Sequence, residues 1–411
     1  MEELFDPRDA AFQADPYPIY ARMRREAPVH MRYFDQPGGE HIPVWALTRW
    51  EDCVAVLRDP RFSAEKPPGL LPLPPELNDA PKEEQPPLLR AFNSLMLFRD
   101  APDHTRLRNL VSKAFTPRTV RSLRSRIESL VDELLAPGAS DGGMDLIHDL
   151  AVPLPIIVIA ELLGVPVEDR DRLKVWSDHA AMLLDGTLRN DHLAVALPSF
   201  VELVDYLKTT IDQRRADPRA DLISGLVAAQ EADDALDDDE VVATCALILG
   251  AGHETTTNLI GNGMYALLRD AAAWARLTRE PELLPSAVEE LLRFDSPVQV
   301  TSRIARETVT IGGYRIPPEV EVNTLLGAAN RDPEHFPDPD RLVLDRRDNR
   351  HLSFGHGAHF CLGAPLARLE AQLAIGALAR RWPGMKLEVD EPPMRPGFVL
   401  RGRTRLPVRL A

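Results

Sequence analysis

A single cysteine near the C-terminal end of the chain has the clearest chemical potential. Cys361 lies in the segment FGHGAHFCLG and directly precedes a helical pattern, LGAPLARLEAQLAIGALARR. Free backbone N–H groups and the positive dipole end at a helix N-terminus stabilise a thiolate. Gly355, Gly357 and Gly363 permit tight turns that let such groups converge on one sulfur. Most lone buried cysteines are only small apolar side chains, but three glycines and a helix start around Cys361 favour a thiolate.

The same segment resembles the haem-binding loop of the cytochrome P450 monooxygenases, whose pattern is F-G-x-G-x-H-x-C-x-G. Every specified position is matched between Phe354 and Gly363. The resemblance implies that Cys361 is the axial thiolate ligand of the haem iron, which favours cleavage of the O–O bond. It also implies that Phe354 packs near the sulfur and that His359 binds a haem propionate.

A second segment, AGHETT, resembles the oxygen-binding groove of that family. Leu247, Ala251 and Thr255 are spaced by four, so they share one face of a predicted helix. The small residues Ala251 and Gly252 are expected to leave room for dioxygen, and a threonine hydroxyl can bond back to the helix and open its ladder. The resemblance implies that Glu254 and Thr255 form an acid–alcohol pair that relays protons.

Three further basic residues match positions that the family uses to bind haem propionates. His104 and Arg108 lie four residues apart in the segment DHTRLR, and Arg303 lies in a predicted strand. A spacing of four places two side chains on one helix face. With His359, these residues would neutralise two buried carboxylates, as the burial of charge demands.

The segment Glu290–Arg293 matches the family's E-x-x-R motif. Alone this pattern is common, because ion pairs three residues apart occur on many helices. Together with Arg341 in the segment DPDRL, the resemblance implies a buried Glu–Arg–Arg network on the cysteine side of the haem. Leu342 stands where the family usually has phenylalanine, a departure that concerns local packing.

These residues need a helical scaffold, and apolar residues at spacings of three and four supply its signal. Asp237 and Glu240 form a capping box that opens a long helix over 240–269; its apolar content all round predicts a central, buried helix. Gly261 within it indicates close helix packing. The other predicted helices cover 17–27, 51–57, 105–115, 117–135, 152–163, 170–184 and 199–216.

Strand-like segments are few and mostly late in the chain: 44–47, 298–304, 308–311, 319–324 and 398–410. The sequence therefore predicts a mainly α fold with a small β region. The resemblance implies the cytochrome P450 fold, with its long central helix over the haem. No charge-rich or Gly/Ser-rich linker divides the chain, so a single domain over 1–411, without a reductase domain, is expected.

Composition excludes several classes of function. The 411 residues carry 48 Lys and Arg against 63 Asp and Glu, a net charge of −15, which argues against binding to nucleic acid or to an anionic membrane. Three scattered cysteines cannot form a disulfide framework, so a reducing, cytoplasmic location is expected. The longest apolar runs are too short to span a bilayer.

The substrate pocket is less well specified. Residues 58–87 contain nine prolines, so regular structure cannot persist there, and the segment is either a surface linker or, given its leucines, a lid or pocket wall. The candidate pocket residues are nearly all apolar and predict a bulky hydrophobic substrate such as a macrolide, terpenoid, steroid or fatty acid. They are Leu89, Phe92, Met96, Leu184, Leu247, Ala251, Val298, Val300, Phe398 and Val399.

The resemblance implies a haem b monooxygenase that uses O2 to hydroxylate or epoxidise its substrate. No flavin or nicotinamide motif is visible, so electrons from NAD(P)H are expected to arrive through a separate ferredoxin and ferredoxin reductase, and a monomer is expected. The predicted docking cluster for an acidic ferredoxin, with scattered solvated charges as the alternative, is Arg106, Lys113, Arg346, Arg347 and Arg350.

Two other functions stay open. One is a peroxide-driven haem-thiolate peroxygenase, which predicts an altered acid–alcohol pair; Glu254 and Thr255 stand against it. The other is a non-catalytic haem-binding protein, which has no need for an oxygen groove.

Overall fold

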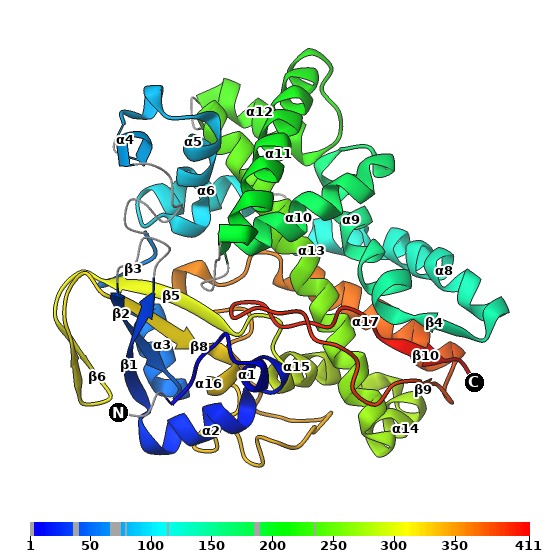
Figure 1. Ribbon diagram of the computed structural model, residues 1–411. Coiled ribbons are helices and arrows are strands. Elements are labelled where there is room, and N and C mark those ends of the chain that lie inside the picture. Colours follow the sequence, from blue (N-terminus) through cyan, green and yellow to red (C-terminus); the bar gives the residue numbers. More distant parts are fainter. Residues whose placement is uncertain are drawn as a thin grey trace.

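The computed structural model describes residues 4–35, 41–65, 75–78, 80–112, 115–184, 190–233 and 236–411. Helices form most of these residues; the larger sheet lies at one side of them, at the left in Figure 1, and a small sheet lies at the opposite side. Among the described residues, no helix combines the length and apolar composition that crossing a bilayer requires.

The long central helix is α13, Asp238–Arg269, and its position explains its composition. The predicted capping box is confirmed: the side chain of Asp237 accepts from the backbone N–H of Glu240, and the Glu240 side chain accepts from that of Asp237. At about 1.5 Å per residue, such a helix crosses the molecule. It packs against α9, α10, α11, α15 and α17, so apolar residues are needed on nearly every side.

The helices around α13 match the predicted spans in part. The predicted helix over 117–135 is interrupted at Leu123, which separates α7 from α8. The principal bounds in this part are α7 Pro117–Ser122, α8 Arg124–Asp141, α9 Pro153–Leu163, α10 Arg170–Leu184, α11 Asn190–Ala216, α12 Leu222–Asp233, α14 Ala271–Arg279, α15 Leu284–Phe294 and α17 Ala364–Arg381.

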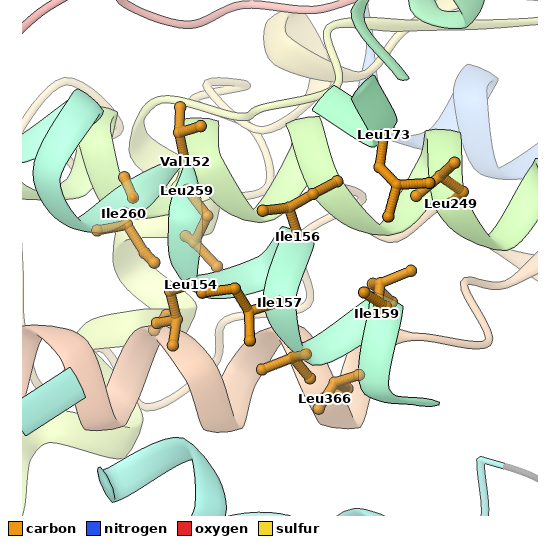
Figure 2. Close-up of a cluster of buried hydrophobic side chains, with 14 of the residues drawn as sticks. Val152, Leu154, Ile156, Ile157, Ile159, Leu173, Leu249, Leu259, Ile260 and Leu366 are labelled. Atoms are coloured by element: carbon orange, nitrogen blue, oxygen red, sulfur yellow. The ribbon is translucent and has the colours of Figure 1, made fainter. Parts of the chain in front are cut away.

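Close packing of α13 with its neighbours depends on small residues. A Cβ at Gly261 would lie 2.5 Å from Cδ1 of Ile147, which confirms the predicted close approach. Figure 2 shows the same region, where the apolar side chains of α9, among them Ile156 and Ile157, pack with Leu259 and Ile260 of α13. These contacts position the central helix against α9.

The main sheet lies beside the helices and contains five strands in the order β1-β2-β8-β5-β3. All neighbours are antiparallel except β2 and β8, which are parallel. Arg303 lies on β5, so the main sheet determines where this side chain is placed relative to the helices. The bounds are β1 Val29–Asp35, β2 His41–Leu47, β3 Phe62–Ser63, β5 Val300–Ala305 and β8 Glu321–Leu325.

Two smaller sheets complete the β region, with the orders β4-β10-β9 and β6-β7. The predicted strand over 398–410 is wrong for most of its length, because only Pro407–Arg409 pairs as a strand. The preceding residues make single bonds to different partners, such as Arg401 N–H to Pro297 O at 2.9 Å. The remaining bounds are β4 Gly143–Asp145, β6 Val309–Ile311, β7 Tyr314–Ile316, β9 Lys386–Leu387 and β10 Pro407–Arg409.

Short helices connect these parts. The predicted helices over 17–27 and 51–57 are confirmed as α2 and α3. Within the proline-rich segment, residues 66–74 and 79 lie outside the described residues. The bounds are α1 Ala10–Ala14, α2 Tyr17–Glu26, α3 Trp50–Arg58, α4 Pro75–Asn78, α5 Pro87–Asn93, α6 Asp103–Ser112 and α16 Leu326–Ala329.

Candidate functional site

Cys361 lies just before the first turn of α17, as the sequence predicts. Its backbone N–H donates to the carbonyl oxygen of Phe354 at 2.9 Å, which closes the loop on itself. Burial raises the pKa of the Cys361 thiol, and the backbone N–H groups of Gly363 and Ala364 act in the opposite direction. Donors at a helix N-terminus suit an anionic, metal-bound sulfur.

The loop depends on two glycines in the left-handed region. Gly355 has φ 70° and Gly357 has φ 73°. At Gly357 a Cβ would also lie 2.4 Å from the carbonyl oxygen of Leu57, so no larger residue fits. Gly363 differs, because its φ of −79° is open to any residue. The predicted need for glycine is therefore confirmed at two of the three positions.

Four basic side chains from separate parts of the chain gather beside this loop. His104 and Arg108 come from α6, Arg303 from β5, and His359 from the loop itself. The rings of His104 and His359 lie 3.9 Å apart, centroid to centroid. The carboxylate of Asp100 acts to raise the pKa values of His104, Arg303 and His359. Its oxygens accept hydrogen bonds from the Ser63 hydroxyl and the Ala64 N–H.

Burial changes the pKa values of the basic side chains in this cluster. Burial, together with the neighbouring Arg303 and His104, lowers the pKa of His359 to about 3. Burial, followed by Arg108, lowers the pKa of His104, and burial lowers that of Arg303. An anionic ligand would offset the charge of the two arginines and would favour protonation of the two histidines. The two propionates of a haem fit this requirement beside a sulfur ligand.

The central helix is open to solvent over one short stretch around Ala251, which is called the opening below. Most residues of α13 are buried, yet Ala251 is exposed and Leu247, Gly252 and Thr255 are partly exposed. The hydroxyl of Thr255 donates to the carbonyl oxygen of Ala251 at 2.7 Å, which confirms the predicted bond back to the helix. Gly252 was expected to face this opening, but a Cβ there would lie 2.8 Å from Cδ1 of Ile159, so it serves packing against α9.

Glu254 is adjacent to Thr255 in sequence but turns to a different side of α13. Its carboxylate is buried, and Oε1 accepts from Nη1 of Arg395 at 2.7 Å. The same Nη1 lies 3.5 Å from Oδ1 of Asp178 on α10. Successive helical residues point about 100° apart, so the acid and the alcohol have separate partners. Sequence reasoning missed Arg395, which lies in an irregular segment.

The predicted Glu–Arg–Arg network around Glu290 is confirmed, but the prediction that Arg341 is its second arginine is wrong. Arg293 donates to Glu290 from Nε at 2.8 Å and from Nη2 at 2.7 Å. The third partner is Arg346, whose Nε lies 3.0 Å from Glu290 Oε2. Arg341 instead has an exposed side chain, 3.8 Å from Asp338.

A turn explains this correction. The backbone N–H of Arg341 donates to the carbonyl oxygen of Asp338, which has φ 48°, and this turn directs the Arg341 side chain to solvent. Arg346 lies where the chain has returned to the α15 surface, and its side chain is buried with Glu290. Several arginines follow one another in this segment, and the sequence carries no signal that separates them.

A second ion pair supports the cysteine loop and was not predicted. Arg368 of α17 donates to Glu289 from Nε and Nη2, each at 2.7 Å. Its guanidinium carbon lies 4.5 Å from the centroid of the Phe354 ring. Burial alone would raise the pKa of Glu289, but hydrogen bonds from Arg368 and His351 outweigh it and lower that pKa to about 2. Arg368 therefore clamps Phe354 and α15 to α17.

The predicted substrate-pocket residues do not form one group. The prediction is wrong for Val300 and Phe398, because both pack in a separate core cluster that contains Phe5, Phe12 and Tyr20. The side chain of Leu184 lies outside the described residues. Those that border the helical core are Leu89 and Phe92, which are buried, and Met96 and Leu247, which are partly buried. Ala251 is exposed, and Val298 and Val399 are partly buried.

The predicted docking cluster is also divided. Arg346 points inward to Glu290, and Arg106 forms a bidentate pair with Glu240 on α13. Lys113 lies outside the described residues, while Arg347 and Arg350 are exposed. The expected single cluster is therefore wrong, because two of its members neutralise acids of this chain.

Comparison with known proteins gives consistent matches over the whole chain. A family model described as cytochrome P450 matches residues 193–404. The chain is 39% identical to the polyketide biosynthesis cytochrome P450 PksS of Bacillus subtilis, over 100% of each protein. It is 43% identical to the cytochrome P450 monooxygenase PikC of Streptomyces venezuelae, over 97% of this chain and 92% of that protein.

A solved structure agrees in fold as well. The crystal structure of P450BioI, in complex with an acyl carrier protein ligated to hexadec-9Z-enoic acid, has a TM-score of 0.89 and 39% identity. The match covers 98% of this chain and 99% of that one. The mainly helical fold with a small sheet is thus shared along the full length.

Proposed function

The chain belongs to the cytochrome P450 family and is a monooxygenase, and from this premise we propose that it binds haem b through Cys361 and oxidises a hydrophobic small molecule. The observation that carries the proposal is the meeting of a sulfur at a helix N-terminus with two histidines and two arginines, whose rings and guanidinium groups lie beside one another. A ligand with a metal ion at its centre and two carboxylates at one edge satisfies both.

Each of these residues has a distinct role in the proposal. Cys361 would bind the haem iron through its thiolate, and Phe354, in contact with Arg368, would shield the sulfur from water. His104, Arg108, Arg303 and His359 would hold the propionates; the side chain of Arg108 is positioned by a 2.7 Å hydrogen bond from Nη2 to the carbonyl oxygen of Phe360. Gly363 and Ala364 supply N–H donors that lower the basicity of the sulfur.

When bound, the haem supplies reductive activation of O2 and transfer of one oxygen atom to the substrate. The chain contributes access and protons. The small side chain of Ala251 leaves space beside the central helix. The hydroxyl of Thr255 is positioned at this space by its hydrogen bond to the Ala251 carbonyl oxygen. The buried carboxylate of Glu254, paired with Arg395, is the acid that delivers protons to this region.

The substrate is proposed to be hydrophobic and bulky, of the polyketide macrolide, terpenoid, steroid or fatty acyl kind. The names of two similar proteins support this choice, since one acts in polyketide biosynthesis and another binds a fatty acyl chain on a carrier protein. The apolar residues Phe92, Met96 and Leu247 at the helical core are consistent with it.

Electrons are proposed to come from NAD(P)H through a separate ferredoxin reductase and an acidic ferredoxin, with the enzyme a monomer of one domain. Docking is proposed to use Arg347, together with two exposed arginines that were not predicted, Arg118 and Arg121. Both lie on α7, which packs against α17, the helix that follows Cys361. On a chain with net charge −15, such local positive charge guides an acidic partner.

The test is a screen of the haem-loaded protein against a macrolactone, a steroid, a cyclic terpenoid, a free long-chain fatty acid and a carrier-protein-bound fatty acyl chain. A change in haem spin state identifies binding. For the binders, turnover with isotopically labelled dioxygen should place one labelled atom in the product. Binding without any oxygenated product, with several ferredoxin systems, would contradict the proposal.

A further inference from the structure

We propose that Arg395 is a positioning residue for oxygen activation, which holds the carboxylate of Glu254 through an ion pair anchored on both the C-terminal segment and α10. This inference rests on the role of Glu254 in the proposed function. Arg395 touches neither substrate nor cofactor in this account; it acts through the acid.

The ion pair lies between the interior and the surface. The side chain of Glu254 is 3% exposed, that of Arg395 is 28% exposed and that of Asp178 is 19% exposed. Arg395 Nη1 lies 2.7 Å from Glu254 Oε1 and 3.5 Å from Asp178 Oδ1. The guanidinium is thus shared between a buried acid and a partly exposed one, so it connects Glu254 to the water side of the molecule.

A second cation completes the group on α10. Lys174 Nζ lies 2.6 Å from Asp178 Oδ2, and Lys174 together with Arg395 offsets the burial of Asp178, so the pKa of that carboxyl is lowered. His253 is the neighbouring residue on α13, but burial lowers its pKa to about 4 and its ring bonds to Ser177. Arg395 and Lys174 therefore both pair with Asp178, and Arg395 also pairs with Glu254.

The backbone that carries Arg395 is fixed on the central helix. Arg395 N–H donates to the carbonyl oxygen of Gly402 at 2.8 Å, and Met394 forms a β-bridge with Arg403. Gly402 is packed so tightly on Asn258 that a Cβ would lie 1.7 Å from its Oδ1. These contacts fix the position of the backbone from which the Arg395 side chain extends.

A stripe of polar residues on α13 receives this segment. Glu254, Asn258 and Asn262 are spaced by four, so they share one face of the helix, and all three are buried. Asn262 Nδ2 donates to the carbonyl oxygen of Arg401 at 2.9 Å, as Glu254 accepts from Arg395. One helix face thus binds the C-terminal segment at successive turns, and Glu254 is the turn nearest the opening at Ala251.

This arrangement predicts a specific defect when the guanidinium is removed. The acid would keep its place in the sequence but lose the partner that orients Oε1, and small misplacements of a catalytic group have large effects on rate. Proton delivery would then fail more often, so electrons would be released as peroxide. Binding of haem and substrate depends on other residues and should change little.

The experiment compares R395Q, R395K, E254Q and the double variant E254Q/R395Q as haem-loaded proteins. R405Q is the matched control, because Arg405 is an exposed arginine in the same segment. Each variant is given the compound with the largest spin-state shift in the screen above. The measurements are peroxide formed per NAD(P)H consumed, the substrate dissociation constant and the thermal unfolding midpoint.

In R395Q we expect the ratio of product to peroxide to fall on the order of tenfold. The substrate dissociation constant should stay within about twofold of that of the unaltered enzyme, because Arg395 makes no hydrogen bond to the substrate in this proposal. R395K should recover part of the loss, and R405Q should resemble the unaltered enzyme. In the E254Q background, R395Q should cause no further loss of product, and the losses in unfolding midpoint should be less than additive.

Equal losses from R395Q in both backgrounds, or an R395Q variant with normal product yield beside a defective E254Q, would overturn the positioning role alone. A different result separates the two proposals: normal product yield in E254Q would contradict the role of Glu254 in the proposed function. The non-additive unfolding midpoints would then still report the ion pair, but without a part in catalysis.

Discussion

The imidazole rings of His104 and His359 lie 3.9 Å apart, although both side chains belong to a cationic cluster with Arg108 and Arg303. Two protonated histidines at this distance would repel each other. The pair is therefore stable as neutral rings in the haem-free protein, and as hydrogen-bond donors once propionates are present.

The first prediction concerns acid stability of the haem-free protein. The pKa of His359 is lowered from 6.5 to about 3 by burial and neighbouring cations. Between these values the unfolded chain binds a proton that the folded chain does not, so stability is complete above pH 6.5 and falls as the pH drops towards 3. H359Q should show a shallower decline of the unfolding midpoint between pH 6.5 and 4; an unchanged slope would contradict the buried neutral state.

The second prediction concerns the iron ligand. C361S removes the thiolate, so the reduced, carbon monoxide-bound protein should lose its red-shifted Soret band. C53S is the matched control, because Cys53 is fully buried on α3 and its Sγ donates to the carbonyl oxygen of Leu47 at 3.5 Å. Absorption spectra of the two variants decide the matter, and a retained red-shifted band in C361S would refute the assignment.

The third prediction separates two threonines of α13. T255A should keep haem and substrate binding but send most electrons to peroxide, because the hydroxyl at the opening is lost. T257A should lose about 1 kcal/mol of stability without uncoupling, since Thr257 Oγ1 donates at 2.8 Å to the carbonyl oxygen of Ala151 on the far side. Peroxide yields per electron, measured together, test both; equal yields would argue against a special role for Thr255.

The fourth prediction follows from the corrected network. R346Q leaves the buried carboxylate of Glu290 with one cation fewer and should cost about 3–5 kcal/mol of unfolding free energy. R341Q should change it by no more than about 0.5 kcal/mol, because its side chain is exposed. Denaturant titration with the two variants side by side is decisive, and the opposite order of stabilities would restore Arg341 to the network.

The fifth prediction concerns the electron donor. Replacing Arg118 and Arg121 with glutamate should raise the apparent Kd for an acidic ferredoxin about tenfold at low salt, and binding by the unaltered enzyme should weaken with ionic strength. R106Q is the control, since Arg106 is engaged with Glu240. Titrations at two salt concentrations measure this, and a salt-independent Kd would rule out electrostatic docking here.

The sequence by itself determined the local parts of the site. The thiolate setting of Cys361, the central helix with its capping box and the bond from Thr255 to Ala251 all depend on residues within a few positions of one another. Spacing and helix geometry therefore suffice to predict them. The Glu290–Arg293 pair is predictable for the same reason, since its members lie three apart on α15.

Tertiary structure decided the partners that come from far along the chain. Arg346 rather than Arg341 completes the Glu290 network because a turn at Asp338 sets which side chain returns. Arg395 reaches Glu254 across 141 positions, and its segment carries no periodic signal. Val300 and Phe398 face a second core for the same reason. Long-range contacts depend on how irregular segments pack, and a local pattern holds no information about that.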